Sequence, residues 1–130
     1  LSKDPHVIYD VAHNEQGIKS ILKTINNIFK KKPIGLFALK EDKELELITN
    51  VMQGRFEKLF VMNDEQGLLM RSETLSMNLS KHGIAAEPMK RFDDFISYLL
   101  NDHPGIIFGS HYMAKPVFEH FQFPFDTGVI

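Results

Sequence analysis

The sequence predicts an α/β domain of the Rossmann-like, three-layer kind, a mostly parallel sheet of five or six strands with helices on both faces. Short apolar runs alternate with segments of helical periodicity along the chain. The runs are continuously apolar, as in parallel strands that are buried on both sides. Because crossovers between parallel strands are right-handed, this alternation places helices on the two faces of one sheet.

The composition suits one small soluble domain, 1–130. The chain has 130 residues, 43% of them hydrophobic and 25% charged, with a net charge of -2. This charge gives no reason to expect nucleic acid or an acidic membrane as partner, and no apolar run approaches the length of a membrane span. The absence of cysteine excludes a disulfide framework and a zinc–thiolate site. We therefore expect small-molecule ligands and a cytoplasmic location.

The first predicted unit is a strand at 6–9 followed by a helix. Asn14 is a candidate N-cap, and three lysines at 30–32 suit the negative end of the helix before Pro33 stops it. The lysine run is therefore interpreted as a solvated helix end. The apolar residues of the helix, spaced three and four apart, are Ile18, Ile21, Leu22, Ile25 and Phe29.

The alternation continues to the end of the chain. Glycines at 54 and 83 are expected to close the second and third helices. The further strands are predicted at 34–39, 59–62, 84–88 and 105–108. The further helices are predicted around 45–52, 70–79, 92–100 and 113–121.

The turn after the first strand, Asp10-Val11-Ala12-His13-Asn14, carries polar groups at the edge where α/β proteins hold ligands. The Asp10 carboxylate follows the strand directly and is placed to bind a hydroxyl pair such as that of a ribose. His13 either contacts a heterocycle or is structural. Asn14 is assigned mainly to helix capping.

The turn after the last strand, Gly109-Ser110-His111-Tyr112, should open on the same edge. A carboxylate can dock at Ser110 beside the amides of a helix start, although Ser110 as a simple N-cap is the alternative. His111 and Tyr112 either rim the same pocket or face solvent and core. For the acidic and amide side chains of the other turns, helix capping is the simpler interpretation: Asp42, Asn63 and Asp64.

Several kinds of site have no support in the sequence. The chain has neither a Gly-x-x-x-x-Gly-Lys-Ser/Thr loop nor a Gly-x-Gly-x-x-Gly turn, so a bound nucleotide would be held by its sugar or base. Ser110 is not part of a Gly-x-Ser-x-Gly elbow, and the six histidines are not paired at helical spacing with another ligand. We therefore expect no metal site and no nucleophile–base pair in this chain.

Segment 5–17, with its Asp-Val-Ala-His-Asn turn, resembles the start of the C-terminal domain of folylpolyglutamate synthase/dihydrofolate synthase, in the Mur ligase superfamily. The family's Asp-Lys-Asp turn corresponds to Asp42-Lys43-Glu44, and its Gly-Ser-x-Tyr turn to 109–112. Murein ligases usually carry Asp-x-Tyr-Ala-His, which favours the folate branch. Two departures are Glu44 for the second aspartate and His111 where leucine is frequent.

The resemblance implies an ATP-dependent ligase of folate biosynthesis and one-carbon metabolism. Such enzymes phosphorylate a folate or dihydropteroate carboxylate and let the amine of L-glutamate attack the acyl phosphate. By resemblance, Asp10, His13 and Asn14 hold the ribose and adenine side of ATP. Ser110 and His111 bind glutamate, and the Asp42-Lys43 turn lies on the face that closes over the reaction centre.

The resemblance also implies what this chain lacks. The phosphate loop, the Mg²⁺ ligands and most of the folate pocket belong to an N-terminal ATPase/folate domain that is absent from this chain. The chain begins at Leu1 without a recognisable targeting signal, so we expect a piece of a longer protein. No catalytic residue is assigned to this domain alone, which is expected to be inactive without its N-terminal domain. Whether the enzyme makes dihydrofolate or extends polyglutamate is expected to depend largely on that domain.

Two other classes of protein fit the same architecture. A flavodoxin-like signalling receiver also has an aspartate after its first strand, but it needs a further acidic pair and a lysine after the last strand, where Ser110-His111 stands. The other class is a protein-interaction module whose polar rim is vestigial. Neither has a ligase role.

Overall fold

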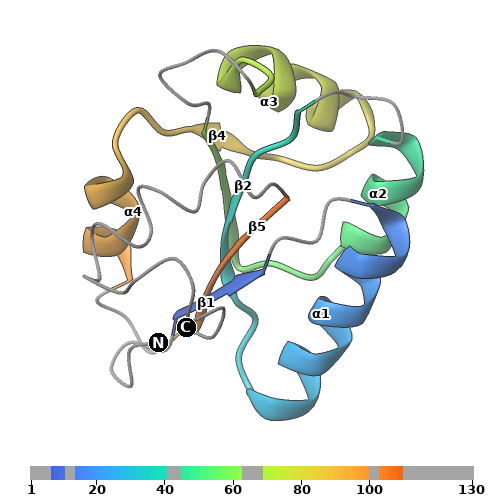
Figure 1. Ribbon diagram of the computed structural model, residues 1–130, viewed down its shortest axis with the longest axis vertical. Helices are drawn as coiled ribbons and strands as arrows, with labels where there is room; N and C mark the ends of the chain where they lie inside the picture. Colours follow the sequence, from blue (N-terminus) through green and yellow to red (C-terminus); the bar gives the residue numbers. More distant parts are fainter. Residues whose placement is uncertain (1–6, 11–13, 41–44, 63–68, 100–102, 110–130) are drawn as a thin grey trace, which may run out of the picture.

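The computed structural model of the chain describes residues 7–10, 14–40, 45–62, 69–99 and 103–109. These residues form a five-stranded sheet and four helices, which confirms the predicted α/β class (Figure 1). In chain order the elements are β1 (Val7–Asp10), α1 (Glu15–Ile28), β2 (Ile34–Phe37), α2 (Leu45–Met52), β3 (Lys58–Val61), α3 (Ser72–Lys81), β4 (Glu87–Pro88), α4 (Phe92–Tyr98) and β5 (Gly105–Phe108).

All strand pairs are parallel, in the order β1-β5-β2-β3-β4. Among the described strands, the last in sequence, β5, therefore lies between β1 and β2. Phe108 at the end of β5 is in register with Asp10 of β1 on one side and with Phe37 of β2 on the other. The carboxyl ends of these three strands are therefore level at one edge of the sheet, as predicted.

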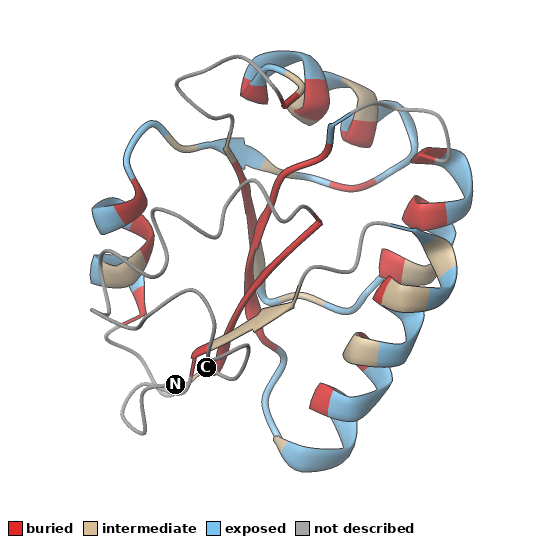
Figure 2. Cartoon of the chain, in the orientation of Figure 1, coloured by how far each residue is buried: buried red, intermediate tan, exposed pale blue. Residues whose placement is uncertain are grey.

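The sheet is covered on both faces (Figure 2). Successive strand residues alternate between two buried clusters, so that Ile106 packs with α1, α2 and α3 while Ile107 packs with α4. Both isoleucines are fully buried. This arrangement confirms the three-layer architecture, and the helix predicted at 113–121 lies outside the described residues.

Several boundaries differ from the predicted ones. Asp10 is the last residue of β1 instead of following the strand. The backbone leaves α1 at Phe29, whose half-buried ring packs on the core, so the lysines at 30–32 follow the helix and are exposed without occupying its last turn. β2 ends at Phe37, two residues earlier than expected.

The strand predicted at 84–88 is only two residues long. Ile84 is used by the preceding helix instead, because its N–H donates to the Leu79 carbonyl at 3.0 Å. The left-handed backbone at Gly83, φ +84°, makes this helix ending possible. Gly54 is also left-handed, φ +69°, so both glycines close helices as predicted. None of the described helices is long and apolar enough to cross a membrane.

Candidate functional site

Asp10 lies at the carboxyl end of β1, where the parallel sheet brings it next to the end of β5. It is half-buried and in register with Phe108. Side chains alternate along a strand, so Asp10 shares the sheet face of Ile8, which packs against the cluster under α1. β1 and β5, the first and last of the strands that the structure describes, are therefore neighbours in the sheet, and a polar stretch of sequence follows each of them.

Tyr9 lies on the opposite face and packs with the cluster under α4. Burial raises the pKa of its phenol well above the ordinary range, and the negative charge of Asp10 adds to the shift. The phenol is therefore neutral at physiological pH and serves as an apolar surface with a protonated hydroxyl.

Gly109 begins the turn after β5 in a left-handed conformation, φ +107°. A Cβ at this position would lie 2.0 Å from the Ala38 carbonyl oxygen and 2.7 Å from the Phe37 ring. The Ala38 N–H also donates to the Phe108 carbonyl at 3.2 Å. The turn that leads into Ser110 is thus pressed against the end of β2, and only glycine fits there.

An aromatic stack lies behind this turn. The Phe37 and Phe108 rings stack with centroids 4.8 Å apart, and Phe56 stacks on Phe108 at 5.5 Å. None of these rings was predicted to have a role at the site. Phe108 ends an apolar run in the sequence, which is a usable signal. Phe37 lies inside the run at 34–39, and Phe56 stands in a short connection with no periodicity, so neither is marked in the sequence.

Asn14 caps α1 as predicted. Its Oδ1 accepts a hydrogen bond from the Gly17 N–H at 2.8 Å, with Asn14 in an extended conformation. Glu15 adds a negative charge to the first turn of the helix. The side-chain oxygen of Asn14 therefore accepts one hydrogen bond from the helix, and the amide NH2 group is the donor that this side chain can offer a ligand.

The remaining predicted site residues lie outside the described residues. They are His13, Asp42, Lys43, Ser110 and His111. The structure thus places Asp10 and Gly109 at one edge and leaves the positions of these five side chains as predictions. Within the described ranges, no group of three or more His, Asp or Glu side chains gathers in a way that could hold a metal ion.

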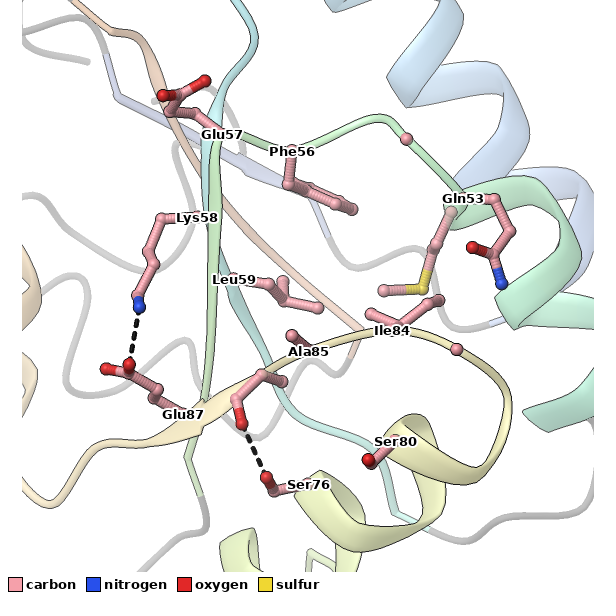
Figure 3. A pocket seen from close by; sticks show the side chains of 14 residues that line it. Gln53, Phe56, Glu57, Lys58, Leu59, Ser76, Ser80, Ile84, Ala85 and Glu87 are labelled. Carbon is pink, nitrogen blue, oxygen red and sulfur yellow. Dashed lines mark hydrogen bonds and ion pairs between the residues drawn. The ribbon is translucent and has the colours of Figure 1, made fainter.

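A separate pocket of about 560 Å³ lies between α2 and α3, beside β3 (Figure 3). The Lys58 ammonium and Glu87 carboxylate form a 2.5 Å ion pair at its rim, and the Ser76 hydroxyl donates to the Ala86 carbonyl at 2.6 Å. No residue of β1 or β5 lines it. It is therefore distinct from the edge that carries Asp10, and no sequence pattern indicates it because its walls come from distant segments.

The fold and the strand order define a doubly wound α/β domain in which the carboxyl ends of β1 and β5 are adjacent. In proteins of this architecture, ligands bind outside the carboxyl ends of the strands. Folylpolyglutamate synthase of Mycobacterium tuberculosis, complexed with ADP and AMPPCP, matches with a TM-score of 0.81 over 95% of this chain at 18% identity. Escherichia coli FolC, in complex with DHPP and ADP, matches with a TM-score of 0.79 over 94% at 16% identity. The Thermotoga maritima folylpolyglutamate synthase gives 0.60 over 88% at 22% identity.

The chain spans only 31%, 30% and 27% of the length of these three proteins. No protein-family model and no curated protein matches the sequence. The chain therefore has the fold of one part of a folylpolyglutamate synthase, in agreement with the resemblance seen in the sequence. Coverage of nearly all of this chain and under a third of those chains fits the expected C-terminal domain.

Proposed function

We propose that the chain is the C-terminal domain of an ATP-dependent ligase that adds L-glutamate to a folate or dihydropteroate carboxylate through an acyl phosphate. The observation that carries the proposal is the register of β1 with β5, which makes the ends of the two motif-bearing strands adjacent. The structural match to folylpolyglutamate synthases supports the same assignment.

In this proposal the first turn holds the nucleoside side of ATP. The two oxygens of the Asp10 carboxylate accept hydrogen bonds from the ribose hydroxyls. His13 and the amide nitrogen of Asn14 lie on the adenine side. Several of the matching structures were determined with ADP, AMPPCP or AMPPNP, which supports nucleotide use by the family.

The second turn binds the incoming glutamate. Ser110 and His111 contact it, and the backbone before them is fixed by Gly109 against β2. One matching structure, a bifunctional folylpolyglutamate synthase/dihydrofolate synthase, carries Mn, AMPPNP and L-glutamate. ATP and Mg²⁺ enter as substrates of the complete enzyme, with the phosphates and the metal held mainly by an N-terminal domain, and the Asp42-Lys43 turn meets that domain when it closes.

Closure of the two domains would exclude water from the acyl phosphate, which water otherwise hydrolyses. This chain contributes positioning to the reaction: it brings the nucleoside and the glutamate amine to the closed site. Residues 1–130 alone are therefore expected to show no ligase turnover. Uptake of phosphate from a small acyl-phosphate donor by this domain would favour the receiver-like alternative instead.

The experiment is steady-state kinetics of the longer protein that carries this domain, measuring ADP release that depends on glutamate and on folate or dihydropteroate. Asp10→Asn removes a charge-assisted contact worth about 1.5–3 kcal/mol, so ATP use should weaken about ten- to hundredfold. Glu73→Gln, which removes an exposed carboxylate from the first turn of α3, is the matched control and should leave it unchanged.

Ser110→Ala is the complementary variant and should mainly impair glutamate use. Unchanged ATP kinetics in Asp10→Asn would remove Asp10 from the site. Equal defects for ATP and glutamate in either variant would indicate misfolding instead of lost ligand contacts.

A further inference from the structure

We infer that Phe56 is a positioning residue for the ligand edge: its ring reaches across β2 on the same face of the sheet and holds Phe108, and with it the turn that begins at Gly109, in place. The role of the edge in ligand binding rests on the function proposed above. The position of Phe56 itself rests on contacts among described residues.

Phe56 lies in the connection between α2 and β3 and is half-buried, with part of its surface lining the pocket between α2 and α3 (Figure 3). Its ring is nearly parallel to that of Phe108, with an interplanar angle of 10° and centroids 5.5 Å apart. Phe108 stacks in turn on Phe37. The Phe108 ring is therefore held between two aromatic neighbours.

The path of the Phe56 ring crosses β2, because β2 lies between β3 and β5 in the sheet. Gly35 of β2 makes this crossing possible: a Cβ there would lie 2.8 Å from the Phe56 ring. A glycine inside a buried strand marks such a close approach. The Phe56 ring thus lies over the backbone of Gly35, which has no side chain, and contacts Phe108 of β5.

Phe108 connects this contact to the edge. Its carbonyl accepts a hydrogen bond from the Ala38 N–H, and the residue after it is Gly109, where a Cβ would lie 2.0 Å from the Ala38 carbonyl oxygen. Phe108 is also in register with Asp10, and cross-strand neighbours share one face of the sheet. A displacement of the Phe108 ring would therefore reach both motif turns.

The first test is native-state hydrogen exchange of the Ala38 amide in Phe56→Leu. We expect exchange about three- to tenfold faster, the equivalent of losing one aromatic pair. The Met89 amide donates a hydrogen bond to the Val61 carbonyl next to β4, away from β5 in the strand order. It is the internal reference, and its exchange should change less. Ile84→Val, a change in the same pocket outside the stack, is the matched control and should not affect Ala38 selectively.

The second test is the kinetics of the longer protein with Phe56→Leu. The KM for glutamate should rise about three- to tenfold with kcat nearly retained, because the turn that begins at Gly109 follows Phe108 directly. The KM for ATP should rise less, because Asp10 is only the cross-strand neighbour of Phe108, and Ile84→Val should keep all three values. Phe56→Met, in which a flexible side chain refills the volume, replaces the leucine variant if that one does not fold. Unchanged KM values, or equally faster exchange at Ala38 and Met89, would overturn the inference.

A failure of the inference about Phe56 can be distinguished from a failure of the proposed function. If the unaltered longer protein does not use ATP and glutamate, the proposed function is wrong, and the exchange rates alone then decide whether Phe56 holds the edge. If the ligase activity is present, both measurements apply to Phe56.

Discussion

The turn after β5 begins in a backbone conformation that L-residues rarely adopt, and the space for a side chain there is filled by the end of β2. An alanine in the left-handed conformation costs about 1–2 kcal/mol by itself. Gly109→Ala should lower the free energy of unfolding by more than this, because its methyl group also meets the end of β2. Gly54→Ala is the control, because Gly54 is also left-handed but a Cβ there would have nothing within 4 Å. Urea unfolding measures both, and equal losses would contradict the crowding at Gly109.

Tyr9 gives a pH prediction at the same edge. Because folding raises the pKa of its phenol, the folded state holds this proton more tightly than the unfolded state. Ionisation of Tyr9 therefore does not affect the free energy of unfolding below the ordinary tyrosine pKa of about 10. As the pH rises above that value, the free energy of unfolding should fall. The loss should be smaller in Tyr9→Phe, which cannot ionise. Denaturant unfolding at pH 9 and at higher pH measures how much the free energy of unfolding falls in each protein. An identical fall in the unaltered protein and in Tyr9→Phe would contradict the prediction.

The Asp10 and Gly109 positions could be recognised from sequence, because each follows an apolar run and the edge is common to all parallel strands. Phe56 could not. Its role depends on the order of the strands, on a glycine in a different strand and on a ring in a third, and none of these is local to its own segment.

Helix α1 begins with a side-chain cap, which gives a prediction for this helix. Asn14→Ala removes the acceptor for the Gly17 N–H and should lower the free energy of unfolding by about 1 kcal/mol. Asn14→Asp keeps an oxygen in the same place and should retain most of that stability. Thermal unfolding followed by far-UV circular dichroism compares the two, and an equal loss in both variants would show that the cap contributes little.

The helices were predicted more accurately than the strand ends. Helical periodicity extends over several turns, so α1 and α4 were located from their apolar faces. β4 was overestimated, because extended residues next to a glycine look alike whether they pair with a strand or complete a helix ending, as Ile84 does.

The two buried clusters share the strands of one sheet, so the domain should unfold as one unit. Ile106→Ala and Ile107→Ala open cavities on opposite faces, and each should cost about 2–5 kcal/mol. Both variants are made in a Tyr112→Phe background, so that Tyr9 and Tyr98, which lie on the α4 face, are the tyrosines that fluoresce. Circular dichroism, dominated by the helices, and this fluorescence should then report the same transition midpoint. Separate midpoints would show that the two faces unfold independently.

The alternation of strands and helices predicted the layers of this domain, but it did not specify that β5 lies between β1 and β2. Strand order depends on how each crossover packs, and the apolar runs are too similar to distinguish their neighbours. The pocket between α2 and α3 was beyond prediction for the same reason.

β4 bounds the sheet with only two residues, and the second of them is Pro88, which has no N–H to offer. A short border of this kind is a poor template for a strand from another molecule. The domain is thereby protected on that side against self-association through backbone pairing.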